Sequence, residues 1–291
     1  MKIAMTGASG FLGSACRPAL EAQGHQIIRL VRRVPGVGEA RWDPENGTVE
    51  ANKLAGIDAA IHFAGENIGG LWTKQKKRRI LESRKNGTRT LCKGLAALDP
   101  RPRVLISISG VNYYGDRGEE ILTEESSSDD SFLSIVCREW ESATAAAFQA
   151  GIRVAIPRLG VVLSRKGGAL RQMMIPFKLG LGAKFGSGKQ WMSWIALEDV
   201  VSMIQYVLEN DSITGSVNAT SPNPIRNRDF TAALARSLHR PAFLTIPAFA
   251  LRVLPGKMAQ ELILASTRAV PDRLLKSGFR FKRDNIEEAL Q

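Results

Sequence analysis

Three glycines near the start of the chain are spaced as Gly-x-x-Gly-x-x-Gly, between an apolar run and a helix-like segment. Gly7 would let the backbone bend, Gly10 would let the main chain approach a pyrophosphate, and Gly13 would let the helix pack on the strand. The free N–H groups and positive dipole at the start of that helix attract phosphates. The turn therefore predicts a dinucleotide site, although an ordinary glycine-rich loop is the alternative.

Two arginines, Arg32 and Arg33, follow the predicted strand at residues 26–31, where NAD-binding folds usually carry an acidic residue. A guanidinium can pair with a 2′-phosphate through two charge-assisted hydrogen bonds, whereas a carboxylate would repel it. The pair therefore favours NADP(H) over NAD(H) as the cofactor. A solvated basic loop is the alternative interpretation.

Strand-like and helix-like segments alternate through the first half of the chain, which is typical of βαβ crossovers and a parallel sheet. Beyond residue 160, glycine-rich and proline-punctuated segments replace this alternation. We expect an α/β fold, with a Rossmann-type doubly wound parallel sheet over residues 1–160 and a smaller C-terminal substrate lobe over 161–291, interleaved with the first. The expected strands lie near residues 2–6, 26–31, 59–64, 103–108 and 152–156, and the expected helices over 11–23, 73–98 and 130–150.

Length and composition limit the class of protein. The 291 residues, 44% of them hydrophobic, can bury a large core. No segment has the apolar length needed to cross a bilayer, and no signal-peptide pattern precedes the first strand. Cys16, Cys92 and Cys137 lack metal-type spacing and are expected to be reduced thiols. These features predict a cytoplasmic protein with a small-molecule substrate, no metal and no membrane partner, and they leave the oligomeric state open.

The formal net charge of +12 raises the question of nucleic-acid binding. Eight basic residues gather on one predicted helix, but no aromatic residues interleave them as stacking platforms. We therefore interpret the cluster as a solvated helix face beside an anionic cofactor, and we expect no specific nucleic-acid partner. The cluster consists of Lys74, Lys76, Lys77, Arg78, Arg79, Arg84, Lys85 and Arg89.

Several motifs together resemble the extended short-chain dehydrogenase/reductases, the NAD(P)-dependent epimerases and dehydratases, and in particular their atypical "epimerase family protein" group. The resemblance covers essentially the whole chain, and its last part resembles that group's own C-terminal domain. It implies a Rossmann fold that binds NADP. The motifs are Ala64-Gly65-Glu66-Asn67-Ile68, Trp72-Thr73, Ser83-Arg84 with Gly87-Thr88, Tyr113-Tyr114-Gly115, Gly186-Ser187-Gly188 with Trp194 and Asp199, Pro271 through Leu274, Gly278-Phe279 and Glu288-Ala289-Leu290.

The resemblance also implies roles for individual residues. The turn residues that would cradle the pyrophosphate are Gly7, Ser9, Gly10, Phe11, Leu12 and Gly13. Arg32 would bind the 2′-phosphate with help from Arg33, and Arg158, after the strand ending at Pro157, would lie near the nicotinamide. Small residues after the third strand would let the riboses approach the backbone. The residues implied on the adenosine side are His62, Phe63, Ala64, Arg78 and Ser83.

The usual catalytic pair of this superfamily is missing. Its tyrosine acts as the general acid, and a lysine four residues later lowers the pKa of that tyrosine. An approximate alignment puts Leu133 and Cys137 in these two places. Ser109 matches the catalytic serine or threonine position, and Tyr113 and Tyr114 are the nearest phenols that could donate a proton. A packing role for the tyrosine pair is the alternative.

These observations predict an NADP(H)-dependent oxidoreductase or epimerase-like protein that transfers a hydride to or from a carbonyl or alcohol carbon. The alternative is an NADPH-binding sensor without turnover, because cofactor groups are kept while catalytic groups are lost. Two tryptophans, Trp191 and Trp194, could wall a ligand or fill the core between the lobes. Asp199 is expected to cap the helix that follows it.

Overall fold

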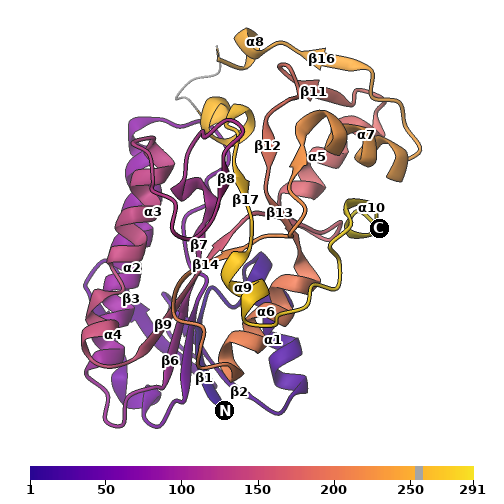
Figure 1. The fold of residues 1–291 in the computed structure, drawn as a ribbon. Coiled ribbons are helices and arrows are strands. Elements are labelled where there is room, and N and C mark those ends of the chain that lie inside the picture. The colour runs from indigo at the N-terminus through magenta and orange to yellow at the C-terminus, as the bar shows by residue number, and fades with distance from the viewer. Residues whose placement is uncertain (253–257) are drawn as a thin grey trace.

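The computed structural model describes residues 1–252 and 258–291, and a largely parallel β-sheet forms its centre (Figure 1). The strand order is β14-β9-β6-β5-β1-β2-β3-β4, and the paired strands run parallel except β3 and β4. This is the expected α/β doubly wound fold with a smaller C-terminal lobe. The strands of the sheet are β1 (Lys2–Thr6), β2 (Gln26–Val31), β3 (Glu39–Asp43), β4 (Thr48–Val49), β5 (Ala59–His62), β6 (Val104–Ser107), β9 (Arg153–Leu159) and β14 (Gly215–Ala219), with β7 (Ser109–Gly110) also paired to β9.

Helices cover both faces of the sheet, so that its central strands are apolar on both sides. On one face, α1 (Phe11–Ala22) and α6 (Leu197–Glu209) enclose a core that contains Met5, Ile61 and Ile106. On the other face, α2 (Lys74–Ala96) and α4 (Ala145–Gln149) pack on Ala4 and Leu105. Figure 1 shows α2, α3 (Phe132–Ser142) and α4 on one side of the sheet, and α1 and α6 on the other.

The smaller lobe has a core of its own around Leu170, Phe177, Trp194 and Phe230. The chain beyond residue 160 also returns to the main sheet, because β14 pairs with β9 and α6 covers the same face as α1. The remaining elements are β8 (Ile121–Leu122), β10 (Val161–Leu163), α5 (Gly168–Lys178), β11 (Ala183–Phe185), β12 (Trp191–Met192), β13 (Trp194–Ala196), β15 (Ile225–Arg226), α7 (Asn227–Ser237), β16 (Leu244–Ile246), α8 (Ala248–Arg252), β17 (Arg268–Ala269), α9 (Asp272–Lys276) and α10 (Ile286–Ala289), with 3-10 turns at Ala51–Leu54 and Val111–Tyr113 and a π-helix at Gln260–Leu264.

Two expected elements differ from the structure. The helix expected over 130–150 is divided into α3 and α4, because the Thr144 hydroxyl donates to the Glu141 carbonyl at 2.7 Å and offers the backbone an alternative to a continuous helix. The strand expected near 152–156 extends to Leu159, so Arg158 lies within β9 rather than after it. Pairing of β9 with β7 and β14 carries the strand through these added residues.

Within the described ranges, no helix is both long enough and apolar enough to cross a membrane.

Candidate functional site

The glycine turn lies where β1 ends and α1 begins, and two of its glycines have no room for a side chain. Gly7 has a φ of +66°, and a Cβ there would lie 3.0 Å from the backbone nitrogen of Ala64. A Cβ on Gly13 would lie 2.3 Å from the Gly7 carbonyl oxygen. The Gly10 N–H donates to that same oxygen at 2.9 Å, which closes the turn. The glycines therefore bring strand, turn and helix into direct backbone contact.

The amino end of α1 offers unpaired backbone donors. Gly10 is its N-cap, no side chain caps the helix, and its first turn carries no acidic residue. Ser9 and Gly10 are exposed, Phe11 and Leu12 are half-buried, and Gly13 is buried. A helix start of this kind binds anions, and the turn fits the diphosphate of a dinucleotide.

The two arginines after β2 have different surroundings. Arg33 donates to the Glu39 carboxylate at 2.6 Å and to the Val34 carbonyl at 2.9 Å. Glu39 also pairs with Arg29 at 2.9 Å, which balances its charge. Arg32 is exposed and makes no ion pair with the residues that the structure describes. Of the two, Arg32 is the guanidinium available to a ligand.

His62, at the end of β5, joins this strand to β1 instead of facing solvent. It is fully buried, and its Nδ1 lies 2.7 Å from the Thr6 hydroxyl. That hydroxyl accepts the Ala64 N–H at 3.3 Å, so its own proton is free to bond Nδ1. Burial, with the nearby charge of Arg84, lowers the pKa of His62 to about 3. The neutral ring therefore holds the chain at Phe63 and Ala64 beside the glycine turn.

The basic face of α2 divides into inward and outward side chains. Lys76 donates to the Glu66 carboxylate at 2.7 Å, and Arg79 lies 3.6 Å from the same oxygen. The Lys76 hydrogen bond, together with the charges of Arg79 and Arg32, holds the pKa of Glu66 below its usual range. Arg32, Glu66, Lys76 and Arg79 thus share one electrostatic environment beside the end of β2.

The two α2 residues implied by the resemblance lie elsewhere. Arg78 has a side chain that is 72% exposed and lies 3.7 Å from Glu82, on the outer face of the helix. The Ser83 hydroxyl accepts the Glu66 N–H at 3.0 Å and donates to the Ile80 carbonyl at 3.2 Å. Ser83 therefore attaches the loop after β5 to α2.

Sequence reasoning did not single out Lys76 and Arg79 within the basic cluster. Their spacing of three residues, which places both on one face of a helix, was the signal that could have separated them from Arg78.

Arg84 is a further cation at this edge. Its Nη1 donates to the carbonyls of Glu66 and Ile80 at 2.9 and 3.2 Å, and its guanidinium stacks on Trp140 at 4.8 Å. A Cβ on Gly65 would lie 3.2 Å from the Arg84 guanidinium carbon, so the glycine allows this close approach. Burial lowers the pKa of Arg84.

A buried polar network lies between α3 and the strands β7, β9 and β14. Arg158 donates to both carboxylate oxygens of Glu141, at 2.9 and 2.8 Å, and to the Tyr114 hydroxyl at 3.0 Å. The Ser109 hydroxyl donates to Glu141 at 2.7 Å, and the Tyr114 hydroxyl donates to Asn218 at 2.7 Å. All three guanidinium nitrogens of Arg158 are therefore engaged within the protein.

The pKa values in this network follow from burial and pairing. Burial opposes the charge of Arg158, but the hydrogen bonds and charge of Glu141 outweigh it and raise the pKa of Arg158. Burial raises the pKa of Tyr114 to about 12, against the effect of Arg158, and the Tyr114 side chain has no exposed surface. Tyr113 is half-buried, and the Arg158 guanidinium lies 3.4 Å from the centre of its ring.

The two residues that the approximate alignment puts in place of the catalytic pair have different surroundings. Leu133 packs in a small core with Trp72, Ile80 and Val136. The Cys137 thiol donates to the Gly110 carbonyl at 3.6 Å, and burial raises its pKa to about 11. Neither side chain replaces a phenol or an ammonium group.

The two tryptophans of the 186–194 segment have separate roles. Trp194 is fully buried and donates to the Asn223 carbonyl at 2.8 Å, so it fills the core of the smaller lobe. Trp191 is half-buried between the guanidinium groups of Arg226 and Arg268, each 4.4 Å from its ring.

The prediction that Asp199 is a helix cap was wrong. The N-cap of α6 is Ala196, and Asp199 lies in the first turn. Its carboxylate accepts the N–H groups of Lys282 and Arg283 at 2.7 and 3.0 Å. Asp199 therefore holds the C-terminal segment against α6.

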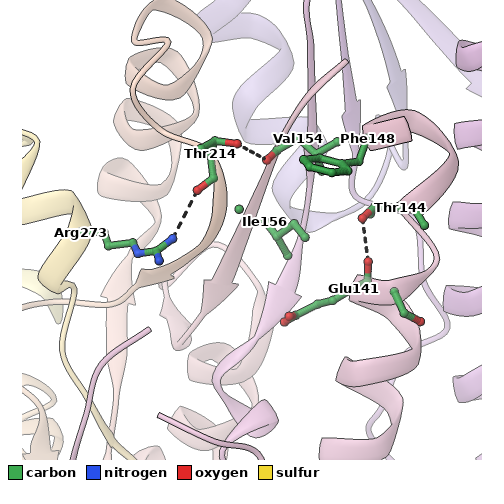
Figure 2. A pocket seen from close by; sticks show the side chains of 10 residues that line it. Glu141, Thr144, Phe148, Val154, Ile156, Thr214 and Arg273 are labelled. Atoms are coloured by element: carbon green, nitrogen blue, oxygen red, sulfur yellow. Dashed lines mark hydrogen bonds between the residues drawn. The ribbon is translucent and has the colours of Figure 1, made fainter. Parts of the chain in front are cut away.

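An open pocket of about 440 Å³ lies between α3, α4, β9 and β14, away from the glycine turn (Figure 2). Its walls include Phe148, Val154 and Ile156, with Glu141 and Arg273 at its polar margin. None of the residues predicted to bind the cofactor lines it. In the part of the chain that the structure describes, no cluster of three or more His, Cys, Asp or Glu side chains could hold a metal ion.

Comparison with known proteins gives a consistent result over the whole chain. The model of the NAD dependent epimerase/dehydratase family matches residues 3–219, and that of a domain of unknown function, DUF1731, matches residues 246–291. Epimerase family protein Mb2239 of Mycobacterium bovis is 40% identical over 290 residues, which cover 99% of this chain and 96% of that protein. Epimerase family protein YfhF of Bacillus subtilis is 39% identical over 296 residues, with coverages of 100% and 97%. The crystal structure of human epimerase family protein SDR39U1 (isoform 2) with NADPH is similar with a TM-score of 0.91 at 30% identity, and covers 100% of this chain and 98% of that chain.

Proposed function

The chain belongs to the NAD dependent epimerase/dehydratase family, and on this basis we propose that it is an NADP(H)-dependent oxidoreductase or epimerase. The observation that carries the cofactor assignment is the start of α1 at the glycine turn, which no side chain caps within the described residues. Beside it, just after the neighbouring strand β2, Arg32 has no ion-pair partner in the described part of the chain. A human relative was crystallised with NADPH, which supports the same assignment. We assign cofactor binding to residues 1–160 and substrate binding to residues 161–291.

In this proposal the residues of the glycine turn hold the diphosphate, and Arg32 pairs with the 2′-phosphate. Lys76 and Arg79 add positive charge beside Arg32, while Arg33, His62 and Ser83 keep the surrounding chain in place. Phe63 and Ala64 form the backbone surface against which the nucleotide lies. Arg78 and Arg158 are left out of the binding set, because Arg78 lies on the outer face of α2 and Arg158 is fully engaged by Glu141 and Tyr114.

When bound, NADPH would supply a hydride to a carbonyl carbon, and the carbonyl oxygen would then need a proton. Tyr113 is the tyrosine that we assign to this step, because its ring is half-buried and its neighbour Tyr114 has no exposed surface. Ser109 and Tyr114 donate their protons to Glu141 and Asn218, so we assign them positioning roles through the buried network.

A second function, an NADPH-binding sensor without turnover, rests on the positions of Leu133 and Cys137. Both side chains are buried where the superfamily has its acid and its cation, and neither can exchange a proton with a substrate at neutral pH. For either function we propose a cytoplasmic location, since the three cysteines are buried free thiols as expected in a reducing compartment.

Titration with NADPH and with NADH, followed by nicotinamide fluorescence, tests the cofactor assignment. We expect tighter binding of NADPH, and Arg32→Ala should remove most of that preference. Arg78→Ala is the matched control, because it removes one exposed arginine from the outer face of α2. Equal binding of both nucleotides would contradict the proposal.

A screen of carbonyl compounds for oxidation of bound NADPH separates the two functions. Turnover that is lost in Tyr113→Phe supports the enzyme. Binding with no oxidation by any compound supports the sensor.

A further inference from the structure

Several large apolar side chains of the smaller lobe are exposed to solvent. They lie in or beside β11, β16 and α8, which Figure 1 draws at the end of the molecule away from the N-terminus. They come from the turn after α5 and from the segment that includes β16 and the start of α8. Phe243 is 79% exposed, Phe249 71% and Leu179 70%. We call this set the apolar tip: Leu179, Leu181, Phe243, Leu244, Ile246 and Phe249.

The two segments of the apolar tip lie side by side. Strand β16 pairs with β11 in parallel, with Ala183 opposite Leu244. Arg240 donates to the Lys178 carbonyl at 3.4 Å, and a Cβ on Gly182 would lie 2.9 Å from the Ala242 Cβ. The tip is therefore one continuous surface.

The shape of the tip fits a flat apolar partner better than a small ligand. Successive residues of a strand point to opposite faces, and all three residues of β16 are exposed. Both faces of β16 are therefore in solvent, so the strand projects from the lobe and does not line a cavity. Exposed apolar surface of this extent marks an interaction site.

The charge around the tip identifies the kind of partner. Lys178 and Arg240 are exposed beside it, and Lys184 lies within β11. The chain has no acidic residue between Glu141 and Glu198, and none between Asp229 and Glu261, so both contributing segments are entirely free of carboxylates. Such a surface repels a second copy of itself and attracts an anionic partner.

We propose that the apolar tip binds the surface of an anionic lipid bilayer. Phe243, Phe249 and the leucines would enter the boundary between headgroups and acyl chains, while Lys178 and Arg240 would pair with anionic headgroups. This proposal departs from the prediction of no membrane partner, which rested on the lack of a bilayer-crossing segment and of a signal peptide. A surface contact needs neither of these. The proposal does not depend on the nature of the substrate.

Sedimentation of the full chain with lipid vesicles tests this proposal. We expect the protein to bind vesicles of phosphatidylcholine mixed with phosphatidylglycerol, to bind pure phosphatidylcholine much less, and to dissociate as salt is raised. The double variant Phe243→Ser/Phe249→Ser should lower the partition coefficient at least about tenfold, because each phenylalanine loses apolar burial. The double variant Lys178→Glu/Arg240→Glu should lower it at least about fivefold.

Two controls each carry one substitution of the same kind elsewhere. Phe148→Ser removes a phenylalanine on α4 that is 68% exposed, and Lys93→Glu reverses an exposed lysine on α2. Both should bind vesicles as the wild type does, and circular dichroism with urea unfolding should show that every variant is folded.

Three results would overturn the proposal. The wild type could fail to bind anionic vesicles, or the tip variants could bind as the controls do. The third result would be a wild-type dimer in sedimentation velocity and a monomer for the Phe243→Ser/Phe249→Ser variant. A second copy of the chain would then cover the tip.

Discussion

The Arg158 guanidinium donates to both carboxylate oxygens of Glu141, at 2.9 and 2.8 Å, in a region where both side chains are almost wholly removed from solvent. Ser109, Ser216 and Tyr114 hydrogen bond to the two partners. The pair joins α3 to β9, the second strand from one edge of the sheet.

Breaking this pair should be costly, because a buried charge without its partner keeps its full desolvation penalty. We expect Arg158→Ala to lower the free energy of unfolding by about 3–5 kcal/mol. The double variant Arg158→Met/Glu141→Leu should recover much of that loss. Urea unfolding followed by circular dichroism measures both.

The control for this prediction is Arg17→Ala, which breaks an exposed pair with Glu21 on α1. Such surface pairs contribute about 1 kcal/mol or less. A cost for Arg158→Ala no larger than that of Arg17→Ala would show that the buried pair does not stabilise the fold.

Lys76 and Arg79 should contribute to the affinity for NADPH through their positive charge beside Arg32. Replacing both with alanine should weaken NADPH binding several-fold and affect NADH less, since NADH lacks the 2′-phosphate. The effect should shrink as salt is raised, because partly exposed charges are screened. Fluorescence titration at two ionic strengths gives the measurement, and the outward-facing Arg78→Ala is the control. An equal loss for both nucleotides would contradict a role at the 2′-phosphate.

His62 should make stability depend on pH below neutrality. Its pKa is lowered to about 3 in the folded protein from an ordinary value of 6.5, so the unfolded chain binds a proton that the folded chain does not. Stability should therefore fall as the pH drops from about 6.5 toward 3, by as much as about 1.4 kcal/mol per pH unit from this residue.

His62→Gln should flatten that slope when urea unfolding is measured across the pH range. Carboxylates also titrate in this pH range, so the control is His239→Asn, which removes an exposed histidine. His239 has a φ of 51°, and asparagine tolerates this left-handed backbone conformation. Identical slopes in the wild type and His62→Gln would show that His62 is not held neutral.

Glu261 should stabilise α3 from a distant part of the chain. Its carboxylate accepts the N–H groups of Phe132 and Leu133 at 3.4 and 2.9 Å, at the start of that helix. Glu261→Ala should cost about 1–2 kcal/mol, and Glu261→Gln less, because the amide oxygen can still accept. Thermal unfolding measures this loss of stability, with Glu21→Ala as the control. Equal melting temperatures for Glu261→Ala and the control would show that the Glu261 carboxylate does not stabilise the start of α3.

The parts of the fold that sequence reasoning predicted correctly rest on local patterns. The apolar runs that became β1, β5 and β6 are buried along nearly their whole length, and β2 is buried at alternate residues. The type and approximate ends of these strands therefore follow from composition. The glycine turn is equally local, because the clash of a Cβ on Gly13 with the Gly7 carbonyl involves residues six positions apart. The helix expected over 130–150 was wrong in its continuity although the cause is also local. The Thr144 hydroxyl bonds the Glu141 carbonyl three residues back, where the helix is divided.

The sequence by itself therefore determined the doubly wound sheet, the glycine turn and the basic character of α2, since each depends on neighbouring residues or on charge alone. Only the tertiary structure decided which basic side chains face the site, because Lys76 and Arg79 gain a partner in Glu66 while Arg78, one residue away, turns outward. It also decided that Arg158 and Tyr114 are held inside the protein, because Glu141, Asn218 and Ser109 come from distant segments. Hydrogen bonds between residues so far apart in the chain depend on how the helices and strands pack, so no local sequence pattern predicts them.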